Sequence, residues 1–186
     1  MSDAASVGSG EYLRLFCALR LPAAAVAGLL AWQDAAFAGA DVRVATAAHL
    51  HVTLAFLGRR LAAEVEPVTA ALRGAADGID PPVLAVRSYR ETRSVGMLVC
   101  DDDEGRATRL AEGLHERLER LGVYERERRE WLPHVTVVRF RRRPRLQPQL
   151  PDLEPFVTSE AAVYMSVLRP SGAQYEVLQS VALEGS

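Results

Sequence analysis

The chain has 186 residues, a length that suits one domain or two small lobes sharing a core. Its composition, 49% hydrophobic and 25% charged, is typical of a globular protein and supplies a core without covalent or metal cross-links. The net charge of −2 excludes a general electrostatic attraction to polyanions, and no run reaches the roughly 20 apolar residues that a helical membrane span requires.

Residues 1–11 are small and polar and lack the basic-then-apolar pattern of a signal peptide. We expect a flexible arm there, followed by a single bilobal domain over residues 12–186. Cys17 and Cys100 lie in apolar runs without metal-type spacing, so we expect buried, reduced thiols. These features favour a cytoplasmic protein without membrane contact, and we expect a monomer.

The remaining elements follow from hydrophobic periodicity and from the positions of Gly and Pro. Strand-type alternation over residues 12–19 is followed by Pro22, which suits the first turn of a helix. The pattern then predicts helix 23–37, strands 42–44 and 51–57 (ended by Gly58), helix 61–76, strands 83–89 and 95–101, helix 104–122, strand 134–140, an irregular segment 141–155, and strands 156–168 and 174–183. His115 lies among Glu and Arg residues and is expected on the solvated face of its helix. Helices alternating with strands indicate an α/β or α+β fold.

Two of these strands carry the same pattern, His-x-Thr-x. It occurs as His51-Val52-Thr53-Leu54 and again as His134-Val135-Thr136-Val137. Because successive side chains of a strand alternate between its faces, each His shares a face with its Thr. The residues between them, together with Phe56, are expected to face the core. The repeat, with strands and a helix around each copy, predicts two related lobes whose sheets face each other across a groove.

Two imidazoles that flank one bound group form an acid–base pair. Histidine has a pKa of about 6.5, so one ring can be neutral while the other is protonated, and each contributes roughly 10²–10⁴-fold in rate. The Thr53 and Thr136 hydroxyls can hold the oxygens of an anionic phosphodiester, and this chemistry needs no metal or cofactor. A metal site is the competing interpretation, with His49 and His51 as a ligand pair, although acidic or further His partners at useful spacing are missing.

At these residues the chain resembles a known family. Leu50-His51-Val52-Thr53-Leu54-Ala55-Phe56-Leu57-Gly58 and Pro133-His134-Val135-Thr136-Val137-Val138-Arg139 are similar to the two motifs of the 2H phosphoesterase superfamily, and within it to the RNA 2′,3′-cyclic phosphodiesterases, also called 2′-5′ RNA ligases. Residues 14–19 resemble that family's opening strand, and residues 166–168 and 172–178 its closing hairpin. The chain departs from the family where Ala48-His49-Leu50 precedes the first motif, a place where Asn is frequent.

The resemblance implies an α+β fold in which two pseudo-symmetric antiparallel-sheet lobes with outer helices surround a central cleft. It implies metal-independent hydrolysis of RNA 2′,3′-cyclic phosphate ends to 2′-phosphomonoesters, with RNA ends or cyclic nucleotides as substrates; the reverse reaction would be 2′-5′ RNA ligation. By this analogy His51 is the proton donor, His134 is the proton acceptor, and Thr53 and Thr136 hold the phosphate.

Three points stay open at this stage. Arg139 is either a phosphate contact, if a bulge or twist turns it to the histidine face, or a structural ion-pair partner. The run Arg141–Arg145 is either an RNA-backbone contact or a solvated charge run. Tyr89, Trp131 and Phe140 are loose options for base stacking. The alternative function is a nucleotide- or RNA-end-binding module with the same cleft and little turnover.

Overall fold

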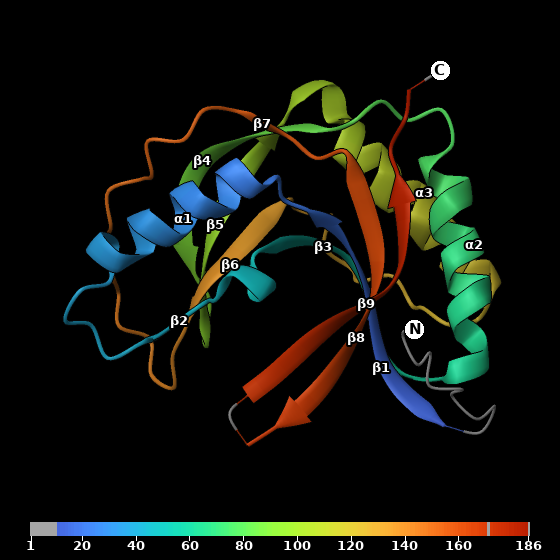
Figure 1. Cartoon of the computed structure of the whole chain (residues 1–186), viewed down its shortest axis with the longest axis horizontal. Coiled ribbons are helices and arrows are strands. Elements are labelled where there is room, and N and C mark those ends of the chain that lie inside the picture. Colours follow the sequence, from blue (N-terminus) through green and yellow to red (C-terminus); the bar gives the residue numbers. More distant parts are fainter. Residues whose placement is uncertain (1–10, 171, 186) are drawn as a thin grey trace, which may run out of the picture.

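The computed structural model describes residues 11–170 and 172–185 of the chain (Figure 1). Apart from Glu11, the predicted arm lies outside the described residues. The described elements are β1 (Tyr12–Arg20), α1 (Ala23–Ala36), β2 (Arg43–Val44), η1 (Ala47–His49), β3 (His51–Leu61), η2 (Ala62–Glu64), α2 (Val65–Ala76), β4 (Val83–Glu91), β5 (Val95–Asp102), η3 (Asp103–Gly105), α3 (Arg106–Arg120), β6 (His134–Arg139), β7 (Phe156–Val157), β8 (Glu160–Arg169) and β9 (Gly172–Ala182), where η marks a 3₁₀ turn.

The strands form one curled sheet with two halves. They run in the order β7-β4-β5-β6-β3-β1-β8-β9, with β2 attached to β6, and the pairings are antiparallel. The halves meet at β3 and β6, where the register contains the single pair Val52–Val135. The α+β fold with two antiparallel lobes is therefore confirmed. The two halves are, however, parts of one curled sheet and not two separate sheets, because the two motif strands lie side by side at the join.

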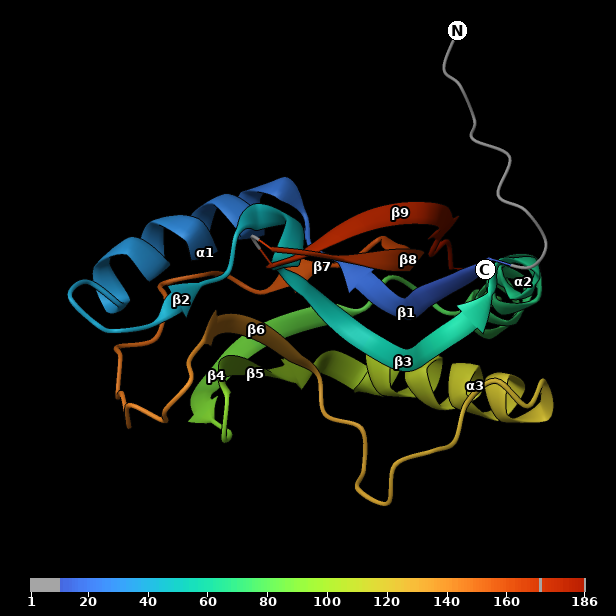
Figure 2. The same cartoon turned by 90° about the horizontal axis from the view of Figure 1, so that it is seen from below.

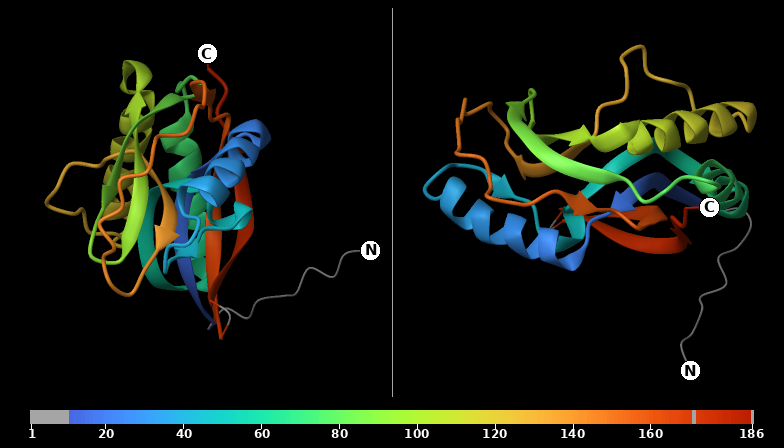
Figure 3. Two further views of the ribbon diagram at one scale, coloured as in Figure 1. Left: turned by 90° about the vertical axis from the view of Figure 1, so that its left-hand side faces the viewer. Right: turned by 90° about the horizontal axis from the view of Figure 1, so that it is seen from above.

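The two halves are built alike, and in each of them the helix that precedes the motif strand packs against the other half. We call α1 and α3 the exchanged helices for this reason. Each motif strand ends a strand–helix–strand unit, β1-α1-β3 in one half and β5-α3-β6 in the other. Helix α1 packs on the opposite half, where its Gln33 reaches β6 and Phe37 contacts Tyr89 of β4. Helix α3 packs on β3, through a hydrogen bond from His115. Seen from below in Figure 2 and from above in Figure 3, α1 and α3 accordingly lie at opposite corners of the molecule.

The main core lies between these helices and the sheet. It contains Cys17 and Cys100, both free and buried as expected. The α3 stripe of Ala107, Leu110, Leu114 and Leu118 is fully buried. His115 is also buried, at 4% exposure, so its predicted place on a solvated face is wrong. It belongs to the same stripe, four residues after Ala111 and three before Leu118.

Several element boundaries differ from the prediction. Gly58 does not end the first motif strand: with φ at +69° it bends β3, which continues to Leu61. The bend is visible in β1 and β3 in Figure 2. The predicted strand 156–168 is divided into β7 and β8. None of the helices in the described part of the chain is long and apolar enough to cross a membrane.

Candidate active site

The two His-x-Thr motifs form a square on one face of the sheet. Since Val52 is opposite Val135 in an antiparallel pair, His51 lies opposite Thr136 and Thr53 lies opposite His134. All four side chains project from the face opposite to the buried Val52 and Val135, and all four are half-buried. The histidines occupy one diagonal, a spacing of about 7–8 Å between strand positions. We call this surface the motif face.

A β-bulge follows each motif threonine. On β3, Cys17 pairs with Ala55 and Ala18 with Thr53, so Leu54 is the extra residue. On β6, Gly96 pairs with Val138 and Met97 with Thr136, so Val137 is the extra residue. A bulge changes the alternation of the strand beyond it, and the two bulges occupy equivalent positions in the two motifs.

The bulges decide the direction of the residue five positions after each histidine. Arg139 is exposed, and its charge lies close enough to His51 to lower the pKa of that ring. This proximity is consistent with the alternative in which the bulge turns Arg139 toward the histidines, and its contact with phosphate stays a prediction. Phe56 is 59% exposed, and its ring stacks on Phe16 at 5.4 Å between centroids. The prediction that Phe56 faces the core is therefore wrong, because flat-strand parity does not survive the bulge at Leu54.

His134 is held in one tautomer. Its Nδ1 lies 2.8 Å from the carbonyl oxygen of Leu132. A carbonyl oxygen only accepts hydrogen bonds, so Nδ1 carries the hydrogen and a neutral His134 keeps its lone pair on Nε2. The segment before His134 is fixed as well, since Trp131 Nε1 donates to the carbonyl oxygen of Thr53 at 3.0 Å. The loop preceding the second motif is thereby tied to the strand of the first.

His51 lies in an aromatic cluster on the same face. Its ring centroid lies 5.1 Å from that of Phe16, 5.5 Å from Tyr175 and 5.8 Å from Tyr164. Its Nδ1 is buried without a hydrogen-bond partner among the described residues. Burial, followed by the charges of His49, Arg139 and His134, lowers the pKa of His51 to about 4. His51 is therefore neutral at neutral pH in the unliganded protein, with cationic groups close by.

His49 is adjacent but has a structural position. It belongs to η1 and not to the strand, and its ring contacts Tyr175 at 4.7 Å. Its Nε2 donates to the carbonyl oxygen of Ala173 at 2.8 Å, while Nδ1 accepts from the Thr46 hydroxyl at 2.7 Å. Because both ring nitrogens are engaged, His49 does not support the alternative of a His49–His51 metal pair. In the described part of the chain, no group of three or more His, Cys, Asp or Glu side chains is placed to hold a metal.

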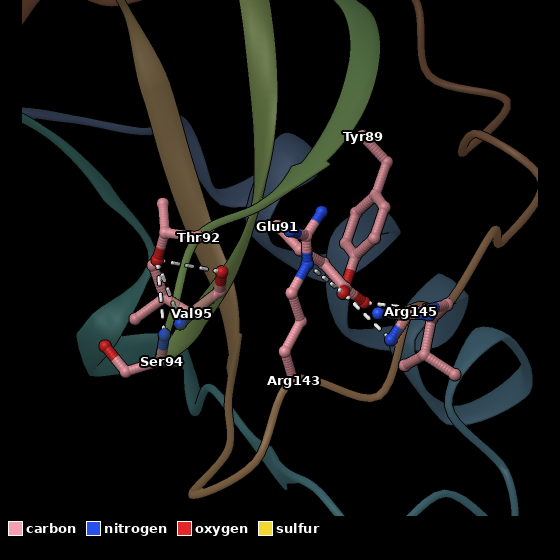
Figure 4. Close-up of polar contacts among 8 residues, drawn as sticks. Tyr89, Glu91, Thr92, Ser94, Val95, Arg143 and Arg145 are labelled. Atoms are coloured by element: carbon pink, nitrogen blue, oxygen red, sulfur yellow. Dashed lines mark hydrogen bonds and ion pairs between the residues drawn. The ribbon is translucent and has the colours of Figure 1, made fainter.

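The arginine-rich segment after β6 is anchored by a buried carboxylate (Figure 4). Glu91, with its side chain 3% exposed, accepts hydrogen bonds from Arg143 Nε at 3.2 Å and from the backbone amides of Arg145 and Leu146 at 3.0 and 2.7 Å. Tyr89 donates to the same carboxylate at 3.2 Å. Arg143 is therefore part of a structural clamp, whereas Arg141 and Arg142 are exposed.

The aromatic side chains suggested for base stacking are mostly engaged elsewhere. Phe140 is buried, Tyr89 bonds to Glu91, and Trp131 bonds to Thr53. The exposed aromatic ring on the motif face is instead Phe56. Beside the His51 cluster there is a cavity of about 250 Å³, lined by Arg20, Leu21, Val26, Ala47, Ala48, Leu50, Tyr164, Tyr175 and Val177.

Comparison with known proteins agrees with the fold. The family model described as LigT like Phosphoesterase matches residues 19–94, which include the first motif. The crystal structure of TT0787 of Thermus thermophilus is 27% identical, with a TM-score of 0.77 over 93% of this chain and 99% of that one. A crystal structure of E. coli LigT with NADP+ is 26% identical, with a TM-score of 0.77 over 94% and 99%.

A more distant likeness is limited to the fold. The MHV ns2 PDE domain is 20% identical, with a TM-score of 0.61 over 83% of this chain and 99% of that one. A search among curated proteins found no match. The sequence match over residues 19–94, the shared fold over nearly the whole chain and the paired motifs make the chain similar to the LigT-like phosphoesterases of the 2H phosphoesterase superfamily.

Proposed function

We propose that the protein hydrolyses 2′,3′-cyclic phosphodiester ends of RNA to 2′-phosphomonoesters without a metal, with His51 as general acid and His134 as general base. The observation that carries the proposal is the diagonal placement of the two histidines, each opposite a threonine of the other motif. The match to a phosphoesterase family model supports an enzyme that acts on phosphodiester bonds. E. coli LigT has been crystallised with 3′-AMP, ATP and phosphate, which supports a nucleotide substrate for this chain.

The fixed tautomer of His134 suits a general base. The bond from Nδ1 to the Leu132 carbonyl leaves the Nε2 lone pair free to accept a proton. In the proposed step, Nε2 takes a proton from water as the water oxygen attacks phosphorus. The carbonyl of Leu132 then stabilises the imidazolium that forms, as a fixed acceptor for its Nδ1–H.

His51 must acquire its proton together with the substrate. Its pKa of about 4 keeps the ring neutral when the site is empty. A bound phosphodiester brings a negative charge that offsets the charge of Arg139 and favours the imidazolium. In the proposed step, the bond between phosphorus and the ribose 3′-oxygen breaks, and His51 transfers its proton to that oxygen. Proton uptake on binding is therefore part of this mechanism.

The remaining groups on the motif face serve binding. Thr53 and Thr136 alternate with the histidines around the square, so their hydroxyls are suited to donate to the non-bridging phosphate oxygens. Arg139 adds a guanidinium whose planar N–H groups match a phosphate. Phe56, exposed and stacked on Phe16, offers its other face to a nucleobase. These features support a single-stranded RNA end or a cyclic nucleotide as substrate.

The test is hydrolysis of 2′,3′-cyclic AMP in EDTA, with the product identified as the 2′- or the 3′-monophosphate. We expect 2′-AMP, full activity in EDTA, and a loss of roughly 10²–10⁴-fold in kcat for His51→Gln and for His134→Gln. Loss of activity in EDTA, or unchanged turnover in both variants, would exclude the two-histidine mechanism.

A second function is favoured by the low pKa of His51. A neutral imidazole is a poor proton donor, so the same face could bind a nucleotide phosphate with little turnover. Calorimetry with 2′-AMP and 3′-AMP, run beside the hydrolysis assay, separates the two functions. Micromolar binding without product formation over the pH range 5–8 would favour the binding module.

A further inference from the structure

Two buried polar side chains reach the motif strands from the exchanged helices. Gln33 of α1 is 1% exposed, and its Nε2 donates to the carbonyl oxygen of Val137 at 2.6 Å. His115 of α3 is 4% exposed, and its Nε2 donates to the carbonyl oxygen of Leu54 at 2.7 Å. Both acceptors immediately follow a motif threonine. The two bonds are therefore equivalent in the two halves, although the donors are different residue types.

Both bonds end at a bulge. Leu54 and Val137 are the extra residues of β3 and β6, where the regular pairing of the strand is interrupted. The rotation of the peptide at a bulge sets the direction of the side chains beyond it. Beyond Leu54 this side chain is Phe56, and beyond Val137 it is Arg139. A rigid donor on a packed helix fixes that rotation more firmly than a water molecule would.

The Gln33 bond is not needed to satisfy its acceptor. The carbonyl oxygen of Val137 already accepts from the Ala45 amide at 2.9 Å. The other end of the Gln33 amide, Oε1, is buried without a hydrogen-bond partner among the described residues, which costs stability. The fold alone thus gives no reason for an amide at this position, since an apolar side chain of similar volume would leave fewer polar atoms unpaired.

We propose that Gln33 and His115 are a matched pair of positioning residues, Gln33 aligning Arg139 with the phosphate and His115 aligning Phe56 with the nucleobase. The proposal rests on the proposed function for the identity of the ligand. Its main content is that Gln33 affects the binding of the phosphate, whereas His115 affects the binding of the nucleobase. Both side chains are buried and bond to backbone carbonyl oxygens, so the effect is expected in binding and rate and not in the route of the reaction.

The decisive variant is Gln33→Met, which removes the donor and the unpaired Oε1 together. We expect its thermal stability to equal or exceed that of the wild type, while affinity for inorganic phosphate and kcat/KM for 2′,3′-cyclic AMP each fall at least tenfold. Leu29→Met is the matched control, because Leu29 lies one turn earlier on the same buried stripe of α1 and bonds to no motif strand. The control is expected to keep its phosphate affinity and its kcat/KM for 2′,3′-cyclic AMP within twofold of the wild-type values.

The second arm uses His115→Met, with His115→Gln as a variant that keeps an amide donor like that of Gln33. We expect His115→Met to bind AMP at least fivefold more weakly with unchanged phosphate affinity, and His115→Gln to restore AMP binding. Gln33→Met with wild-type phosphate affinity would overturn the role of Gln33. Equal losses of affinity for AMP and for phosphate in His115→Met would overturn the role of His115. If His115→Met does not fold, the same result in His115→Gln would overturn it.

The binding measurements keep this proposal separate from the proposed function. If neither the wild type nor any of the variants hydrolyses 2′,3′-cyclic AMP, the hydrolase proposal fails. The split between phosphate and AMP affinity then still decides whether Gln33 and His115 position the two parts of the ligand.

Discussion

The low pKa of His51 predicts a specific loss of stability in acid. The ring is neutral in the folded protein down to about pH 4, whereas an unfolded chain protonates histidine near pH 6.5. Between these two values the unfolded state binds more protons, so stability decreases as the pH falls. At 1.36 kcal/mol per pKa unit, the full effect below pH 4 is about 3 kcal/mol. Between pH 7.5 and pH 5 the His51 contribution is about 2 kcal/mol.

The assay is urea unfolding of the wild type and of His51→Gln at pH 7.5 and pH 5. Carboxylates titrate in both proteins, so their effect cancels in the comparison. We expect acidification to lower the free energy of unfolding of the wild type by about 2 kcal/mol more than that of the variant. Parallel losses in the two proteins would refute the reasoning, because they would mean that burial does not keep the His51 ring neutral.

Three further predictions concern the groups around the site. Arg139→Gln removes a charge that lowers the pKa of His51, so an NMR titration should place that pKa above the wild-type value; an unchanged pKa would separate Arg139 from the site. Glu91→Ala removes the carboxylate that holds residues 143–146, so trypsin should cut within 141–145 several-fold faster than in the wild type, and an equal rate would contradict the clamp. Gly96→Ala would place a Cβ 2.6 Å from Val138 Cγ1, and we expect it to lower the free energy of unfolding by about 1–3 kcal/mol in urea; a neutral result would show that the bulge can relax.

The sequence predicted what depends on local alternation. His51 shares a face with Thr53, and His134 with Thr136, because no bulge separates the members of either pair. The same rule failed at Phe56, since the bulge at Leu54 depends on how β3 registers with β1, a pairing between distant parts of the chain. Arg139 remained undecided at the sequence level for the equivalent reason on β6.

The positioning residues were missed because their neighbours in sequence suggest another environment. His115 is flanked by charged residues, yet its spacing from Ala111 and Leu118 places it on the buried stripe. Gln33 follows the buried Ala25 and Leu29 at intervals of four, which would have indicated a buried amide. Gln33 and His115 each reach the opposite half because α1 and α3 pack there. No local pattern contains this information.

The central claim is that His51 and His134 bind one and the same phosphate. The most direct test is NMR of the protein with ¹⁵N-labelled histidine, titrated with inorganic phosphate at constant pH and assigned with His51→Gln and His134→Gln. The account predicts that the ring nitrogen signals of both residues shift with one common dissociation constant, and that the His51 signal moves toward the protonated form. A response from only one of the two rings, or two different dissociation constants, would contradict it.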